Sequence, residues 1–156
     1  MRTYAPKGKT PEIRAPLSRD HLSSMSGITP DGKLYMQVQD KSYKGEDAAG
    51  FLKHLLRHIE GKLLVLWDRS PIHRSQAVKD FLASAEGSRI HLEQLPAYAP
   101  ELNPDEGVWN YLKRVELKNV NCQDLDQLYR ELRKAKERLR HKTEVIKSFY
   151  RMAGLY

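Results

Sequence analysis

A short hydrophobic run, Lys62-Leu63-Leu64-Val65-Leu66-Trp67-Asp68, decides the fold class of this chain. The residues between the lysine and the aspartate are all apolar. A continuous apolar run of this length, preceded by a helical pattern, is typical of a strand buried on both faces in a parallel sheet. The run therefore predicts an α/β fold with Asp68 at the carboxyl end of an interior strand.

The neighbouring segments complete the α/β pattern. Residues 46–59 carry apolar side chains at helical spacing, and Gly61 is suited to end that helix. Residues 75–85 show a second helical pattern, and residues 89–95 alternate as a second strand. Parallel strands need a crossover helix of this kind between them. We expect a mixed sheet flanked by helices in one domain covering residues 1–156.

The outer parts of the chain contribute a hairpin and the final helices. Residues 21–28 and 34–38 alternate on either side of Thr29-Pro30-Asp31-Gly32, an order that favours a tight turn. Residues 105–115 are predicted to form a helix directly after a proline-rich loop. A last helical region follows over residues 124–150 and is expected to break near Lys142-Thr143.

Composition restricts the classes of function. The chain of 156 residues has 27 Lys and Arg against 20 Asp and Glu, a net charge of +7. Its single cysteine excludes an internal disulfide and any zinc site with paired thiolates. No apolar run is long enough to span a membrane, and no apolar signal segment follows Met1. We expect a cytoplasmic protein without a membrane partner.

The positive charge is concentrated in the C-terminal third. Residues 107–156 hold 12 Lys and Arg against 6 Asp and Glu. Nine of these cations fall within a basic helical region at about residues 122–152, and six of them are expected to form its basic surface: Arg130, Arg133, Lys134, Lys136, Arg138 and Arg140. Such a region favours a polyanionic partner, nucleic acid above all, and the alternative is a solvated helix face.

Two acidic residues occupy positions suited to chemistry. Asp68 ends the apolar strand, where open α/β sheets place their ligands, although it is equally suited to cap the next turn. Glu106 lies in the first turn of its helix, where an acid also compensates the helix dipole. Since consecutive helical side chains point about 100° apart, at most one of Asp105 and Glu106 can closely face Asp68. Converging carboxylates of this kind bind Mg²⁺, and two such metal ions together catalyse phosphodiester cleavage in many enzymes.

Several segments carry a resemblance to a known family. Residues 64–68 (LVLWD), 72–75 (IHRS) and 95–113 (LPAYAPELNPDEGVWNYLK), together with residues 4–11 and 27–32, resemble the DDE transposases of the mariner superfamily. The resemblance is strongest to the bacterial insertion-sequence branch. The string Leu-Pro-x-Tyr-x-Pro-x-Leu-Asn-Pro-x-Glu is highly specific, and the similarity extends from about Thr3 to Lys113.

The resemblance implies a ribonuclease H-like fold with three catalytic acids that bind Mg²⁺ or Mn²⁺. Asp68 matches the second acid and Glu106 the third, 38 positions later, as catalytic and metal-ligating residues. Such enzymes cut transposon ends with water and join the freed 3′-hydroxyl to target DNA. The implied partners are therefore transposon-end and target DNA, at the bacterial nucleoid, with the six cations of the basic helical region binding DNA.

One departure from the family pattern concerns the first acid. The family carries it on a strand upstream of the segment that matches residues 5–11, and no acid lies between Met1 and Tyr4. We therefore expect that the chain lacks the first catalytic aspartate, its strand and the helix-turn-helix DNA-reading domain. That strand belongs between the hairpin and the Asp68 strand, so its loss leaves two strand edges unpaired.

An incomplete sheet has consequences for activity. We expect the chain alone to be weakly active or inactive, and to be completed by an upstream-frame polypeptide or in a homodimer. The alternative is a non-catalytic nucleic-acid-binding remnant of a transposase. Two neighbours of Asp68 have open roles: Arg69 either competes with a metal or contacts phosphate, and His73 either approaches the active site or bonds within the turn.

Overall fold

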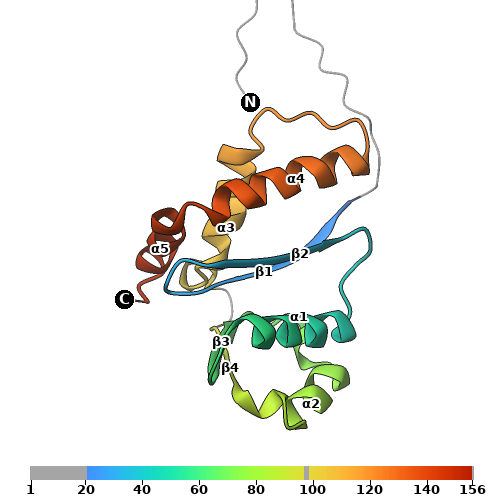
Figure 1. Ribbon diagram of the computed structural model, residues 1–156, viewed down its shortest axis with the longest axis vertical. Coiled ribbons are helices and arrows are strands. Elements are labelled where there is room, and N and C mark those ends of the chain that lie inside the picture. The colour runs from blue at the N-terminus through green and yellow to red at the C-terminus, as the bar shows by residue number, and fades with distance from the viewer. Residues whose placement is uncertain (1–20, 97–98, 156) are drawn as a thin grey trace, which may run out of the picture.

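The computed structural model describes residues 21–96 and 99–155. Residues 4–11 and 97–98, which contribute to the family resemblance, lie outside this part. The elements, coloured along the chain in Figure 1, are β1 (Ser23–Ile28), β2 (Leu34–Gln39), α1 (Gly45–His58), β3 (Leu63–Trp67), a 3₁₀ turn (Pro71–Arg74), α2 (Gln76–Ala83), a 3₁₀ turn (Gly87–Arg89), β4 (Ile90–Gln94), a 3₁₀ turn (Pro100–Leu102), α3 (Asp105–Tyr111) continued by a π-helical turn (Leu112–Glu116), α4 (Leu125–Arg140) and α5 (Thr143–Met152).

The predicted hairpin is confirmed. Strands β1 and β2 pair antiparallel, with Ile28 opposite Leu34 beside the turn. Within the turn the Gly32 N–H donates to the Thr29 carbonyl at 2.8 Å. Gly32 adopts φ +86°, a left-handed conformation that glycine adopts without steric cost. The turn sequence therefore sets the register of the strands.

The predicted parallel pair is also confirmed. Strand β3 lies parallel to β4, with Leu63 opposite Ile90, and α2 lies within the connection between them. Within the described ranges, β1 pairs only with β2 and β3 pairs only with β4. Among the described residues, the strands are therefore divided between two small sheets.

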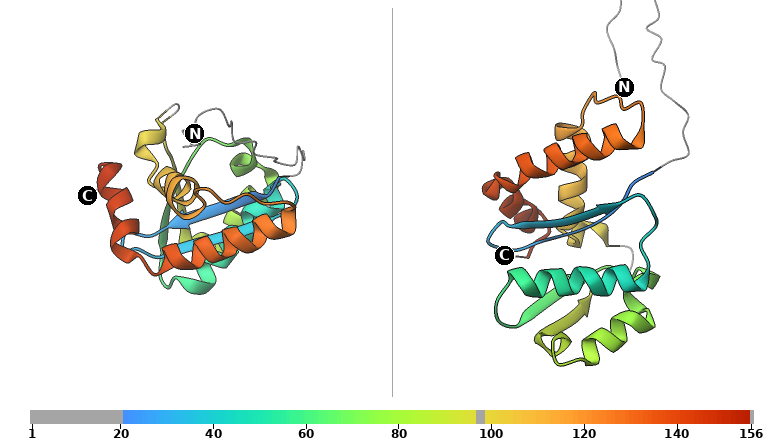
Figure 2. Two further views of the ribbon diagram at one scale, coloured as in Figure 1. Left: turned by 90° about the horizontal axis from the view of Figure 1, so that it is seen from above. Right: turned by 45° about the vertical axis from the view of Figure 1, so that its right-hand side comes forward.

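The hairpin lies between two groups of helices. Helices α4 and α5 lie on one side of it and α1 on the other, as both Figure 1 and the right-hand view of Figure 2 show. Because side chains alternate along a strand, β2 contributes to two cores. Leu34 and Met36 pack with α3, α4 and α5, whereas Tyr35 packs against the core of α1 and α2. The hairpin therefore joins the two halves of the structure.

The prediction that the Leu63–Trp67 strand is buried on both faces is wrong for the described structure. Leu63, Val65 and Trp67 pack against the core of α1 and α2. Leu64 and Leu66, on the other face, are 63% and 39% exposed. The alternation arises because, in the part of the chain that the structure describes, helices cover only one face of the β3–β4 sheet.

The C-terminal region forms two helices, as predicted. Helix α4 begins after Asp124, whose side chain accepts a hydrogen bond from the Gln127 N–H at 2.7 Å. The break falls at His141 and Lys142, next to the predicted position. Among residues 21–96 and 99–155, no helix is both long and apolar enough to cross a lipid bilayer.

Glu116, the last residue of the π-helical turn after α3, binds side chains at the junction between α4 and α5. Its nearly buried carboxylate accepts hydrogen bonds from Arg138 at 2.5 Å and Lys142 at 2.7 Å, and Lys142 also donates to the Tyr111 hydroxyl. Burial alone would raise the pKa of Glu116, but the bonds from Lys142 and Arg138 outweigh it and hold the pKa below its ordinary value. The cluster therefore stabilises the folded state through the ionised form of Glu116.

We expect Glu116→Gln to lower the free energy of unfolding at pH 7 by about 1–2 kcal/mol, since its partners remain partly exposed. A lowered pKa stabilises the fold fully above its unfolded value, near 4.5, and this stabilisation is lost as the pH falls below that value. Urea titrations at pH 7 and pH 4 should therefore show a smaller difference between wild type and variant at pH 4. Glu137→Gln, at an exposed pair with Arg140, serves as the control.

Candidate active site

Asp68 follows the last residue of β3, at the carboxyl end of the strand. Its side chain is 62% exposed, and one carboxylate oxygen, Oδ1, accepts a hydrogen bond from the Ser70 N–H at 2.9 Å. The other oxygen, Oδ2, has no hydrogen-bond or ion-pair partner in the described part of the chain. The turn-capping role and the ligand role are therefore compatible, because capping uses one oxygen and leaves the second open to solvent.

His73 holds Asp68 from the other side. The imidazole stacks on the Trp67 ring with centroids 4.0 Å apart and planes 2° apart, and only 11% of the His73 side chain is exposed. Its Nδ1 lies 3.1 Å from Asp68 Oδ1 and 3.1 Å from the Asp68 carbonyl oxygen. Of the two roles open to His73, the structure shows the hydrogen bond within the turn, and the same ring nitrogen contacts the Asp68 carboxylate.

Asp105 takes the inward position in the first turn of α3. Its Oδ2 accepts hydrogen bonds from the Ser26 hydroxyl at 2.6 Å and the Trp109 indole N–H at 3.1 Å. Its Oδ1 is buried and has no hydrogen-bond partner in the described structure. Burial raises the pKa of Asp105 above its ordinary value, against the bonds from Ser26 and Trp109, and the carboxylates of Glu106 and Asp68 raise it further. Asp105 thus ties α3 to β1 within electrostatic range of Asp68.

Glu106 takes the outward position beside it. Its side chain is exposed and lines a groove of about 440 Å³ between the start of α3 and the end of α5. Helix α3 approaches α5 closely at Gly107, where an added Cβ would lie 2.6 Å from the Phe149 ring. The two consecutive acids therefore have different environments, as the angle between helical neighbours requires.

The two predicted ligands do not form a complete metal site in the described structure. Residues 21–96 and 99–155 contain no group of three or more His, Cys, Asp or Glu side chains placed to hold a metal ion. The roles of Asp68 and Glu106 as metal ligands therefore stay predictions.

Sequence reasoning did not assign the inward position to Asp105. The signal lies in the helical period, because Asp105, Val108, Trp109 and Leu112 recur at the spacing of one face. Val108 and Leu112 are fully buried, so a residue three or four positions before them faces inward too. The contacts of His73 had no such signal, since they depend on the 3₁₀ turn after Asp68.

The six predicted DNA-binding cations are distributed around α4. Arg138 is bound to Glu116, Lys134 to Glu131 at 2.8 Å, and Arg140 to Glu137 at 3.2 Å. Arg133 and Lys136 point toward β2, whereas Arg138, five positions after Arg133, points about 140° away from it. Arg138 therefore has a structural role, and the remaining cations belong to more than one face.

The fold is similar to that of solved transposase structures. The paired-end complex of Mos1 transposase with the left transposon end matches 99% of this chain and 50% of its own, with 17% identity and a TM-score of 0.63. The Mos1 mariner paired-end complex with Mn matches equally long shares, with 16% identity and a TM-score of 0.64. The catalytic domain of Mos1 mariner transposase matches 87% of this chain and 79% of its own, with 14% identity and a TM-score of 0.55.

These identities show the fold alone, which is the ribonuclease H-like arrangement of that catalytic domain, and the chain spans about half the length of the first two structures. No curated protein sequence matches the chain. A family model described as DDE superfamily endonuclease matches residues 1–129. With most of its length covered by that match, the chain belongs to the DDE superfamily endonucleases.

Proposed function

We propose that this chain is the catalytic part of a DNA transposase from a bacterial insertion sequence, acting on transposon-end and target DNA at the nucleoid. The observation that carries the proposal is the position of Asp68 at the carboxyl end of β3, in a chain of the DDE superfamily. A paired-end complex with the left transposon end is among the structures of similar fold, which supports DNA as the substrate.

The donor atoms of Asp68 and Glu106 suit Mg²⁺ or Mn²⁺. Asp68 offers a carboxylate oxygen without a partner among the described residues, and the Glu106 carboxylate is exposed. Oxygen ligands of this kind are what hard divalent cations prefer. We propose that Asp68 and Glu106 bind the cation, with water and a DNA phosphate completing its coordination shell. When bound, such cations activate water and stabilise charge at a phosphodiester.

The chain's own residues orient these ligands. Ser70 and His73 fix the carboxylate of Asp68 relative to β3, and Trp67 holds the His73 ring in place. Asp105 fixes the first turn of α3 against β1, which sets the direction in which Glu106 projects. Positioning of this kind lowers the entropy cost of assembling the site on DNA.

A further strand is part of the proposal. Strands β1 and β3 each have one strand partner in the described structure, and the exposed Leu64 and Leu66 offer apolar surface beside β3. We propose that a strand carrying the first acid pairs with both and is supplied by an upstream-frame polypeptide. Translating the DNA directly upstream of the Met1 codon in three frames identifies the candidate segment.

Nicking of supercoiled plasmid tests the catalytic proposal. The chain, coexpressed with the upstream segment, is expected to convert supercoiled plasmid to open circles in the presence of Mn²⁺ and to stop when EDTA is added. Asp68→Asn should reduce this rate by at least about a thousandfold, since a lost ligand costs several kcal/mol at the transition state. The proposal fails if the variant nicks as fast as the parent protein.

The second candidate function is DNA binding without catalysis. The basic helix α4 favours it, since Arg130 and Arg133 form no ion pair within the described residues. Both functions require an affinity for DNA that falls steeply with salt, because each phosphate contact releases counterions. The chain coexpressed with the upstream segment is called the completed protein below. If this protein shows no Mn²⁺-dependent nicking but keeps salt-sensitive DNA binding, the second function is favoured over the first.

A further inference from the structure

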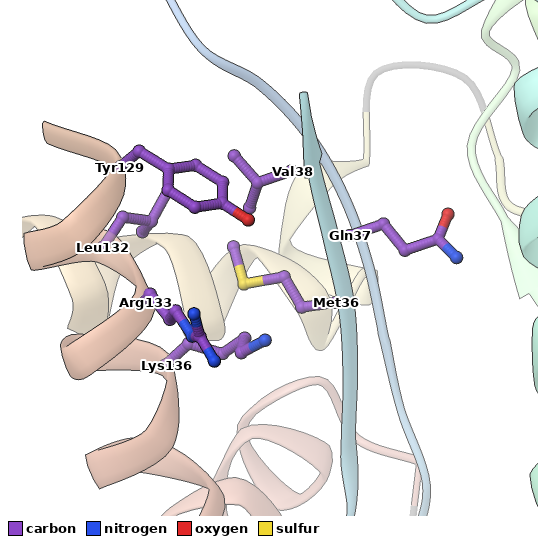
Figure 3. A pocket seen from close by; sticks show the side chains of 7 residues that line it. All are labelled: Met36, Gln37, Val38, Tyr129, Leu132, Arg133 and Lys136. Atoms are coloured by element: carbon purple, nitrogen blue, oxygen red, sulfur yellow. The ribbon is translucent and has the colours of Figure 1, made fainter. Parts of the chain in front are cut away.

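A cavity of about 420 Å³ lies between strand β2 and helix α4, apart from the candidate active site. Figure 3 shows side chains entering it from both elements, whereas Gln37 points to the opposite side of β2. The side chains that the argument uses are Met36 and Val38 of β2, and Tyr129, Leu132, Arg133 and Lys136 of α4.

The cavity combines an apolar floor with cationic walls. Met36 and Leu132 belong to the core and are less than a tenth exposed, and they form the floor. Arg133 has no hydrogen bond or ion pair in the described structure, and Lys136 is 3.7 Å from Glu137, which does not line the cavity. None of the described side chains that line the cavity is acidic. The cavity therefore attracts an anion that also carries an apolar or aromatic group.

Tyr129 adds an aromatic ring to the apolar and cationic side chains that line the cavity. Tyr129 is 43% exposed, so its ring is accessible to a partner. On α4, Tyr129, Arg133 and Lys136 are spaced four and three positions apart, so they form one stripe beside the core. The stripe places an aromatic face next to two cations over an apolar floor, as Figure 3 shows.

We propose that this cavity binds an unpaired nucleotide of single-stranded DNA. Arg133 and Lys136 bind its phosphate, and the base packs on the Tyr129 ring above Met36 and Leu132. The inference rests on the proposed action on DNA and specifies the form of DNA that this surface takes. The cavity volume lies within the range of about 300–1,000 Å³ typical of sites for small ligands.

The apolar part of the cavity favours a single strand over the alternatives. In a duplex the bases are stacked on each other and paired, so a duplex phosphate would use Arg133 and Lys136 but leave Tyr129 without a partner. An acidic peptide would use the same cations and would also have no need of an aromatic face. Stacking of a base on an aromatic side chain is the general means by which proteins hold single strands.

The test compares variants within α4 by fluorescence anisotropy with fluorescein-labelled dT10 at fixed salt. We expect Tyr129→Leu, which keeps an apolar side chain, to weaken dT10 binding by about tenfold while leaving binding of a ten-base-pair duplex unchanged. Arg133→Gln should weaken dT10 binding by a similar factor. The matched control lies outside α4: Arg57→Gln removes the same charge from the exposed side of α1, on the other side of the hairpin, and should change binding less than about threefold.

A second measurement keeps the inference falsifiable if Tyr129→Leu fails to fold. In the wild-type chain, thymidine 5′-monophosphate should shift the NMR signal of the Met36 methyl group in a saturable manner, whereas a tetraglutamate peptide should not. The inference is overturned if Met36 does not respond, if the peptide shifts its signal instead, or if Arg57→Gln weakens dT10 binding as much as Arg133→Gln does.

The outcomes separate this inference from the proposed function. Plasmid nicking that depends on Asp68, with dT10 binding unaffected by Tyr129→Leu, overturns the inference and leaves the transposase proposal intact. Selective loss of dT10 binding in Tyr129→Leu supports the inference, even where the completed protein does not nick plasmid.

Discussion

Glu106→Gln is expected to abolish Mn²⁺-dependent plasmid nicking by the completed protein, whereas Asp105→Asn is expected to keep most of it. The two residues are adjacent acids in the same turn of α3, and the substitutions are chemically equivalent. Glu106 is exposed to the groove, so its carboxylate is available to a metal ion. We expect a loss of at least about a thousandfold for Glu106→Gln, corresponding to about 4 kcal/mol at the transition state.

The different outcome for Asp105→Asn follows from its contacts. An asparagine retains an oxygen that accepts the hydrogen bonds now made by the Ser26 hydroxyl and the Trp109 indole, so α3 stays tied to β1. Asp105→Ala leaves both donors without an acceptor and should cost about 1–3 kcal/mol of unfolding free energy. We therefore expect Asp105→Asn to nick within about tenfold of the parent rate.

The measurement is the nicking rate of the three proteins at equal concentration, with thermal unfolding as a check on folding. The opposite pattern, with Asp105→Asn inactive and Glu106→Gln active, would assign the third ligand to Asp105 and contradict the assignment proposed above. The comparison is decisive because Asp105 also offers a carboxylate oxygen, which is buried and has no partner among the described residues.

Completion of the sheet is expected to produce the largest change in stability. A strand between β1 and β3 would add hydrogen bonds along two edges and cover Leu64 and Leu66, which are 63% and 39% exposed. At about 0.5–1.5 kcal/mol for each net hydrogen bond, roughly five bonds and the added apolar burial amount to about 3–7 kcal/mol. For a chain of this size we expect a rise in Tm of about 10–20 °C.

Differential scanning calorimetry checks this expectation. The chain alone should unfold in a broad transition at low temperature, and the coexpressed complex with the upstream segment should unfold in a sharper one. A segment with proline in place of two central strand residues serves as the control, since proline cannot donate to the ladder. A sharp, high-temperature transition from the pure monomeric chain would count against the need for a further strand.

Local sequence signals predicted most of the fold. The turn Thr29–Gly32 gave the hairpin, the apolar run Leu63–Trp67 gave a strand with a parallel partner, and the break near Lys142 separated the last two helices. These features depend on residues close together in the chain. Backbone preferences and the period of the apolar residues are sufficient to produce them.

The same signals predicted the position of the candidate ligands but not their environments. Asp68 was expected at the carboxyl end of its strand, and the structure places it there. The prediction that both faces of β3 are buried was wrong. Burial depends on which elements cover the strand, and the apolar run alone does not specify those elements. The basic character of α4 was visible in the sequence, whereas the attachment of Arg138 to Glu116 was not.

The sequence by itself therefore determined the order of elements, the family resemblance and the two candidate acids at chain positions 68 and 106. Only the tertiary structure decided that Asp105 faces inward to Ser26, 79 positions away, and that Arg133 and Lys136 face β2. These outcomes depend on contacts between segments far apart in the chain. Side-chain period restricts which residues share a face, but the packing of one element on another decides what that face meets.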